Sequence, residues 1–199
     1  MKYIIGIDEV GRGCLAGPIT VAAFVATAHP RQISQLLHGI KDSKKLSPQQ
    51  REEWYARLEG KTRFFAVSAS VGPTTIDRVG ITRSATIAVG RCLRSLKEKS
   101  KLGSLASKST ILLDGSLYAP RTYANQETII KGDEKIPLIA AASIVAKVRR
   151  DRLMCRLHRK ISQYQFDLHK GYGTAIHIHA IKKNGLSAVH RKSFCTKFS

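Results

Sequence analysis

The feature that most constrains this chain is the stretch of residues 4–13, which reads IIGIDEVGRG. Its apolar, β-branched beginning is typical of a buried strand. Asp8 and Glu9 end that strand, and ionised carboxylates are costly to bury without partners. A divalent cation is the partner that fits best, because hard cations bind carboxylate oxygens. In the Gly11-Arg12-Gly13 turn that follows, the glycines allow close approach of the backbone and Arg12 suits a phosphate. A strand that simply ends in a polar turn is the alternative.

The charge of the chain narrows the class of partner. Among its 199 residues, 34 are Lys or Arg and 14 are Asp or Glu, which gives a formal net charge of +20. Such a surface favours a polyanion, and nucleic acid before membrane. Residues 147–199 hold 13 of the Lys and Arg residues, against Asp151 and Asp167 alone. We therefore expect the C-terminal quarter to build most of a polyanion-binding face.

Cysteine usage and hydropathy indicate the compartment. Four cysteines lie far apart without a CxxC pair, at Cys14, Cys92, Cys155 and Cys195. This spacing favours reduced thiols in a cytosol over a zinc site or a disulfide framework. The sequence begins with a strand pattern and no leader pattern. Its longest apolar runs, near 19–26 and 136–146, fall short of the roughly 20 residues that a membrane span needs. We expect a soluble cytoplasmic protein that acts as a monomer, with no membrane partner.

The pattern of apolar residues predicts an α/β fold. Strands are expected at 3–9, 19–27, 63–71, 110–113 and 128–130. Helices are expected at 31–38, after a capping box at 47–50, and at 82–97, 137–160 and 174–183, with a loop at 98–109. A meander of strands comes first and later strands alternate with helices, which indicates a mixed sheet covered by helices. No repeat or long linker divides residues 1–199, so we expect one domain with a basic helical part at about 147–199.

Two more carboxylates are candidate metal ligands. Asp114 ends a short apolar strand, and Asp133 opens the segment that leads into the long helix. Ligands of α/β sheets gather where strands end, and carboxylates that meet there repel each other unless cations bind between them. Nucleases commonly place two Mg²⁺ or Mn²⁺ ions roughly 4 Å apart in such a site. Taken separately, each residue favours a structural role, Asp114 as an ordinary turn aspartate and Asp133 as a helix cap.

Several other side chains are candidates for contact with a nucleic acid. Lys44 and Lys45 leave a turn beside the capped helix, where phosphate contacts form easily, although a solvated lysine pair is an equal reading. Tyr172 lies in Gly-Tyr-Gly, where an exposed ring suits stacking on a sugar or base, with a core tyrosine as the alternative. Ser143 and Lys147 share one face of the long helix and are candidates to support Asp133 or the substrate.

The remaining polar residues are read mainly as structural. His190 and Arg191 are either a basic contact near the substrate or a closure of the C-terminal part. His177 and His179 are two residues apart, so on a helix they face different ways and make a poor metal pair. Asp151 sits among arginines and is expected to pair with them.

The motifs, taken together in order, resemble one family. They are DEVGRG at 8–13 with AGP at 16–18, DSKKLS at 42–47, LLDG at 112–115, KGD at 131–133, IAAASIVAK at 139–147, HKGYGT at 169–174 and HRKSF at 190–194. Their order and spacing are similar to those of the type 2 ribonucleases H, specifically bacterial ribonuclease HII, from about residue 3 to residue 194. The sequence departs from that pattern at Cys14, Gly80 and Leu186, where the family usually has Pro, Asn and Pro. Cys14 borders the glycine turn, so it puts the rigidity of that turn in doubt.

The resemblance implies a ribonuclease H-like fold, a mixed five-stranded sheet flanked by helices with a helical C-terminal extension. It implies a metal-dependent endoribonuclease that cuts the RNA strand of RNA–DNA hybrids and single ribonucleotides embedded in duplex DNA. The products would carry 3′-hydroxyl and 5′-phosphate ends. It assigns Mn²⁺ or Mg²⁺, as two ions with substrate, to Asp8, Glu9, Asp114 and Asp133. It also assigns recognition of the 2′-hydroxyl to Gly11-Arg12-Gly13, and packing on the deoxyribose after the scissile junction to Tyr172.

Three alternatives remain open at this point. A non-catalytic nucleic-acid binder would have no use for carboxylates at strand ends, because they repel phosphate. Another two-metal nuclease, such as a DNA junction resolvase, would cut a branched substrate made only of DNA. A ribonuclease HIII-like enzyme typically carries an additional N-terminal substrate-binding domain, which we expect to be absent because the catalytic strand starts at residue 3.

Overall fold

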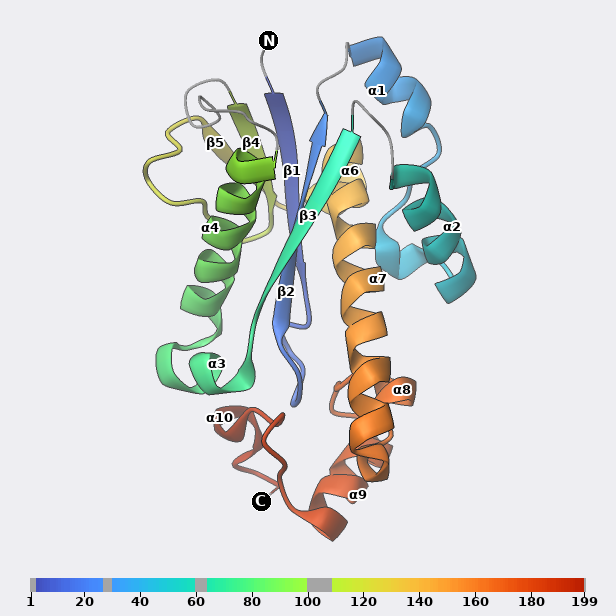
Figure 1. Ribbon diagram of the computed structural model, residues 1–199, viewed down its shortest axis with the longest axis vertical. Coiled ribbons are helices and arrows are strands. Elements are labelled where there is room, and N and C mark those ends of the chain that lie inside the picture. Colours follow the sequence, from blue (N-terminus) through green and yellow to red (C-terminus); the bar gives the residue numbers. More distant parts are fainter. Residues whose placement is uncertain (1–2, 27–29, 60–63, 100–108, 199) are drawn as a thin grey trace.

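A five-stranded mixed sheet forms the centre of the computed structural model, which describes residues 3–26, 30–59, 64–99 and 109–198 (Figure 1). The strand order is β3-β2-β1-β4-β5. The strands are β1 (Tyr3–Val10), β2 (Ile19–Ala26), β3 (Phe64–Val71), β4 (Ser109–Asp114) and β5 (Gln126–Ile129). The first three run antiparallel as the predicted meander, whereas β4 pairs in parallel with both β1 and β5. The prediction of an α/β fold with a mixed sheet is confirmed.

Helices cover both faces of this sheet (Figure 1). They are α1 (Pro30–Leu36), α2 (Pro48–Leu58), α3 (Pro73–Val79), α4 (Ile81–Lys99), α6 (Gly132–Lys135), α7 (Pro137–Lys160), α8 (Phe166–His169), α9 (Ala175–Asn184) and α10 (Lys192–Cys195). Two single turns of 3-10 helix, at Ser43–Lys45 and Ser162–Tyr164, join them. In Figure 1, α3 and α4 lie on one side of the sheet and α2 and α7 lie on the other; α8 and α9 gather at the lower end of α7, whereas α10 lies beneath α3.

The residues of β2 explain how one sheet supports two hydrophobic cores. Every residue of this strand is buried, and successive side chains of a strand point to opposite faces. Val21 and Val25 belong to the core that α4 covers, whereas Ala22 and Phe24 belong to the core under α2 and α7. The uninterrupted apolar run of β2 is therefore the sequence of a central strand that is covered on both faces.

Most predicted elements are present, and their ends coincide with the prediction or shift by one or two residues. The helix after residue 47 has the expected capping box, in which the Ser47 hydroxyl accepts from the Gln50 backbone and the Gln50 side chain accepts from the Ser47 backbone. Helix α3 was not predicted, because it has only seven residues and its one buried side chain is Ile76. The expected loop at 98–109 falls largely on residues 100–108, which lie outside the described residues, as do Thr27 and Arg63 at two expected strand ends.

The C-terminal extension is tied back to the loop that follows β1. A small cluster of buried side chains, which includes Met154, Tyr164 and Phe166, joins the end of α7 to the extension. An isolated antiparallel bridge then pairs Ala16 with His190. None of the helices in the described parts of the chain has the length and apolar character that crossing a bilayer requires.

Candidate active site

Three carboxylates meet at the ends of two adjacent parallel strands. Asp8 and Glu9 lie near the end of β1, and Asp114 is the last residue of β4. Because β1 and β4 pair in parallel with Ile7 opposite Leu113, their carboxyl ends reach the same edge of the sheet. One oxygen from each carboxylate can be chosen so that all three lie within 4.8 Å of one another. The structure thus brings together three carboxylates that the sequence analysis placed at the ends of strands.

The surroundings of the three carboxylates disfavour their negative charge. Burial raises the pKa of Asp8 well above its ordinary value, and the charge of Glu9 adds to this shift. Burial also raises the pKa of Glu9 and of Asp114, and the pKa of Asp114 is raised further by the neighbouring charge of Asp133. The buried Oε2 of Glu9 finds no hydrogen-bond donor among the described residues. An oxygen-lined site with excess negative charge and an unsatisfied acceptor is suited to a divalent cation.

Asp133 lies beside the cluster, but the structure does not group its carboxylate with the other three. The backbone N–H groups of Gly132 and Asp133 donate to Oδ1 of Asp114, at 2.7 Å and 3.3 Å. The carboxylate of Asp133 instead accepts from Nζ of Lys44, at 3.1 Å. Asp133 is buried, so its charge is balanced here by a lysine from the 3-10 turn Ser43–Lys45.

The other predicted supporting residues have partners that the sequence did not reveal. Lys45 pairs with Glu134 at 3.1 Å, so both lysines of the 3-10 turn reach α6. The Ser143 hydroxyl shares a 2.8 Å hydrogen bond with Ser43 and supports Asp8, where it lowers the carboxyl pKa. Lys147 pairs with Asp151 at 2.9 Å, one turn further along α7. The expectation that Asp151 pairs with arginines is therefore wrong in this respect, because an i,i+4 lysine reaches it first.

The two glycines of the turn after β1 have different structural roles. Gly11 has φ of +86°, and a Cβ atom there would lie 2.2 Å from Nε of Arg150. Gly13 is exposed, and a Cβ atom there would meet no atom within 4 Å. Arg12, between them, pairs with Glu9 at 3.3 Å. Gly11 is thus required by the fold, whereas Gly13 leaves open space close to the carboxylates.

Tyr172 presents its ring at the surface of the loop between α8 and α9. Its side chain is 40% exposed. The ammonium of Lys147 and the guanidinium of Arg150 each lie 5.9 Å from the ring centroid. Of the two readings from the sequence, this exposure favours a surface ring over a core tyrosine, and such a ring can stack on a nucleotide.

Comparison with known proteins identifies the family. The model of the family described as ribonuclease HII matches residues 5–197. The chain belongs to the ribonuclease HII family. It is 40% identical over 197 residues to ribonuclease HII of Chlorobium phaeobacteroides, and the match covers 99% of this chain and 92% of that protein. Family membership makes it a ribonuclease H, an enzyme that acts on RNA–DNA hybrids, and it decides against the non-catalytic alternative.

Solved structures of the type 2 ribonucleases H share the fold of this family member. The structure of the PCNA:RNase HII complex from Archaeoglobus fulgidus matches with a TM-score of 0.74 and 26% identity, over 97% of this chain and 94% of that one. Bst-RNase HIII in complex with Mn²⁺ matches with a TM-score of 0.69 and 24% identity, over 92% of this chain and 63% of that one. The predicted ribonuclease H-like fold is confirmed.

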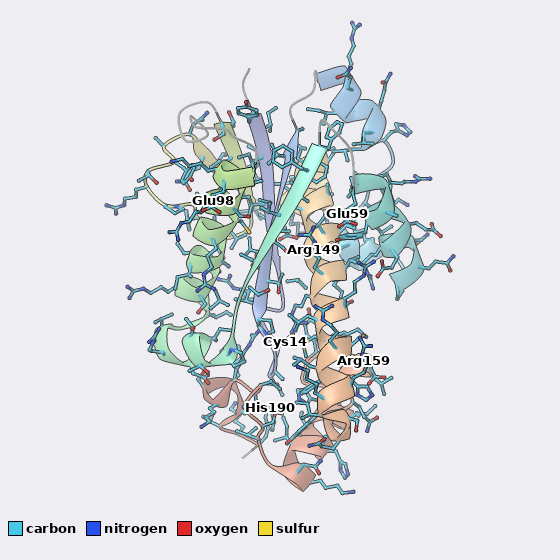
Figure 2. The ribbon with its side chains drawn as sticks, in the orientation of Figure 1. Cys14, Glu59, Glu98, Arg149, Arg159 and His190 are labelled. Atoms are coloured by element: carbon cyan, nitrogen blue, oxygen red, sulfur yellow. The ribbon has the colours of Figure 1, made fainter. Side chains whose placement is uncertain are left out.

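His190 and Arg191 lie inside the enzyme, between the loop after β1 and the C-terminal extension. Both side chains are buried, at 2% and 0% exposure. Figure 2 shows His190 in the C-terminal part below the sheet, and its backbone forms the bridge with Ala16. Arg191 donates to the backbone carbonyls of Gly11, Arg12 and Gly17. Of the two readings from the sequence, these contacts support the structural closure, because a buried guanidinium whose donors are satisfied by carbonyls does not face solvent.

A chain of neutral histidines, which the sequence did not predict, supports the backbone of Tyr172. Nδ1–H of His177 donates to the Tyr172 carbonyl at 2.9 Å, and Nε2–H of His190 donates to Nε2 of His177 at 3.1 Å. The backbone N–H of Ser187 donates to Nδ1 of His190, which fixes this direction of the chain. Burial lowers the pKa of both His177 and His190 to about 4. The expectation that His177 and His179 face different ways is confirmed, since only His177 is buried.

Proposed function

We propose that this enzyme is a divalent-metal-dependent endonuclease that cuts the RNA strand of RNA–DNA hybrids and also cuts duplex DNA at a single embedded ribonucleotide. The products would carry 3′-hydroxyl and 5′-phosphate ends. The observation that carries the proposal is the convergence of Asp8, Glu9 and Asp114, whose ligand oxygens lie within 4.8 Å of one another. Three carboxylates this close together repel one another, and burial raises the pKa of each, so a catalytic role accounts for their proximity.

The residues of this cluster fit Mg²⁺ or Mn²⁺. Asp8, Glu9 and Asp114 would hold the ion, with the unsatisfied Oε2 of Glu9 as one donor. Asp133 would join them on release of Lys44, as the fourth member of the proposed set. A divalent ion bound there supplies Lewis-acid polarisation of the phosphodiester and balances the negative charge. The structure of Bst-RNase HIII in complex with Mn²⁺ contains that ion in a protein of the same fold.

The loops around the cluster would select the substrate. The open space at Gly13 gives a sugar access to the backbone of the turn, and a 2′-hydroxyl can both donate to and accept from backbone groups. The exposed ring of Tyr172 would pack on the deoxyribose that follows the ribonucleotide. Lysines 44 and 45 and the basic residues of 147–199 would contact phosphates.

The proposal also covers the domain organisation, the oligomeric state and the compartment of the enzyme. We take residues 1–199 as one catalytic unit that acts as a monomer in the cytoplasm. The four cysteines lie far apart in the sequence without a CxxC pair, a spacing that favours a reducing compartment. Gel filtration of the reduced enzyme tests the monomer.

The experiment uses a labelled DNA duplex that contains one ribonucleotide, incubated with Mg²⁺, with Mn²⁺ or with chelator. A long RNA–DNA hybrid, a DNA duplex without ribonucleotides and a branched DNA junction are run beside it. We expect metal-dependent cleavage of the first two substrates only, with a 3′ end that a polymerase extends. The Asp8→Asn variant should bind the hybrid without cutting it. Glu98→Gln, an exposed carboxylate on α4 (Figure 2), is the matched control.

Each alternative has its own outcome. Cleavage in chelator would contradict the metal requirement. Cleavage of the hybrid alone would remove single ribonucleotides from the substrate range, and cleavage of the branched DNA would favour a junction resolvase. Wild-type turnover by Asp8→Asn would refute the assignment of the carboxylate cluster.

A further inference from the structure

Two arginines are buried completely beside the active site. Arg150 lies on α7 and Arg191 precedes α10, and both side chains are 0% exposed. Within the described ranges, no carboxylate lies at ion-pair distance from either guanidinium. A buried charge is costly unless its donors are satisfied. Backbone carbonyls accept from the guanidinium donors here, and the positions of these carbonyls indicate which segments each arginine holds in place.

Arg191 binds the loop that follows β1. Its Nη2 donates to the carbonyl of Gly11 at 2.7 Å, its Nη1 to that of Arg12 at 2.9 Å, and its Nε to that of Gly17 at 2.9 Å. These carbonyls lie at the two ends of one loop. A single planar guanidinium with fixed donor directions therefore fixes the shape of the turn that would read the 2′-hydroxyl.

Arg150 joins this loop to the segment that carries Tyr172. Its Nε donates to the Pro18 carbonyl at 3.0 Å and its Nη2 to the Ala16 carbonyl at 3.2 Å. On the other side, its Nη1 donates to the Lys170 carbonyl at 2.8 Å. The backbone N–H of Leu15 adds a direct bond to the Gly171 carbonyl at 2.8 Å. One side chain thus spans both loops.

We propose that Arg150 and Arg191 are positioning residues that set the distance between the turn at 11–13 and Tyr172. The inference rests on the proposed function, in which the turn reads a ribose and Tyr172 packs on the next sugar. Those two sugars are joined by one phosphodiester, so both loops engage together only at a fixed separation. A misplacement of about 1 Å in such a site can reduce rate by about 100-fold.

The two arginines have separable effects. Arg150 binds both loops. Its loss should therefore impair cleavage at a single ribonucleotide followed by DNA, because that substrate must contact the turn at 11–13 and Tyr172 at the same time. Arg191 holds only the first loop, and every substrate presents a 2′-hydroxyl to it. Lysine keeps the charge at each position but lacks the planar fork that reaches several carbonyls.

The test compares kcat/KM on two substrates of the same sequence, a duplex with one ribonucleotide and a long RNA–DNA hybrid. We expect Arg150→Lys to lower kcat/KM on the first by about 10- to 100-fold, with a clearly smaller loss on the hybrid. Arg191→Lys should lower both alike. Arg94→Lys, on the exposed side of α4, is the matched control and should change neither. Each rate is divided by the fraction of that variant that is folded at the assay temperature, which thermal melts provide.

A second variant separates the loops while both arginines stay in place. Gly171 has φ of +88°, and a Cβ atom there would lie 2.5 Å from the Ala16 carbonyl oxygen. Gly171→Ala should therefore reproduce the selective loss. Gly39→Ala is its control, because Gly39 has a similar φ of +76° and open space around its Cβ position. In a Tyr172→Ala background, Arg150→Lys should add no further selective loss.

Equal losses on both substrates for Arg150→Lys and Gly171→Ala would overturn the inference, and so would a selective loss that persists without Tyr172. Failure of both variants to fold would overturn it as well, because the arginine would then hold the fold rather than the separation of the loops. A wild-type enzyme that cuts the hybrid but not the single ribonucleotide would instead refute the proposed function, so the two failures are distinguishable.

Discussion

Alanine substitutions at Gly11 and Gly13 should separate folding from substrate reading. At Gly11, the left-handed backbone costs an L-residue about 1–2 kcal/mol, and the overlap with Arg150, at 2.2 Å, adds about 1–3 kcal/mol. We therefore expect Gly11→Ala to lower the free energy of unfolding by about 2–5 kcal/mol. Gly13 has no positive φ, and a Cβ atom placed there would meet no neighbour within 4 Å. Gly13→Ala should change the free energy of unfolding by less than about 1 kcal/mol.

Catalytic activity should not follow stability, because Gly13→Ala should impair cleavage although it leaves the free energy of unfolding almost unchanged. The methyl group of Gly13→Ala enters the open space through which a sugar would approach the turn. We expect kcat/KM to fall by about 10- to 100-fold on both the single-ribonucleotide duplex and the hybrid. Urea unfolding gives the stability of each variant, and initial rates on the two substrates give kcat/KM. Gly72→Ala is the matched control, because Gly72 also has an ordinary φ of −78° and open space at its Cβ position.

The result that would refute this reasoning is a Gly13→Ala enzyme with wild-type stability and wild-type kcat/KM on both substrates. The backbone beside Gly13 would then not approach the ribose. A large loss of stability in Gly13→Ala would contradict the structure itself, since the position would not be open.

Three further predictions concern charge. Asp114→Asn should abolish cleavage yet raise the melting temperature of the metal-free enzyme, because one of three mutually repelling carboxylates becomes neutral; cleavage gels and thermal melts check this, and normal turnover would contradict it. Affinity for duplex should fall with salt, with a log–log slope of about −0.9 per phosphate contacted; a flat response in binding titrations would exclude a basic contact face. His177 and His190 should titrate near pH 4 by NMR. Both pKa values lie below the unfolded value of about 6.5. The stability that the neutral imidazoles contribute is therefore present above pH 6.5 and is lost as the pH falls toward 4. Titration midpoints near 6.5 would contradict the burial of these side chains.

The sequence predicted the fold well where burial alone decides the element. The apolar run of β2 and the run LIAAASIVA at the start of α7 are buried residue by residue, so hydrophobic pattern and structure agree. Short elements such as α3 and α8 escaped prediction. The four residues of α8 are too few for a period to show, and α3 has one buried side chain, Ile76, so tertiary contacts rather than pattern stabilise both.

The sequence predicted the arrangement of the candidate site only for residues that lie at the ends of strands. Asp8 and Asp114 meet because parallel strands end together, which a sequence can suggest. The pairing of Asp133 with Lys44 could not be foreseen in the same way, because the two residues belong to separate short turns that are 89 positions apart. Their contact depends on how the 3-10 turn and α6 pack, and no local pattern encodes that.

The same limit applies to the large positive charge. A count of Lys and Arg treats every one as available to a polyanion, but several basic residues of the C-terminal quarter are engaged within the protein. Arg149 faces Glu59 at 3.5 Å (Figure 2), and Arg152 pairs with Glu52 at 2.5 Å. Arg150 and Arg191 are buried against carbonyls and still contribute to the long-range field that attracts nucleic acid, although they cannot touch a phosphate. The net charge therefore predicts the class of partner correctly while it overstates the number of contacts, and the salt dependence of binding measures the difference.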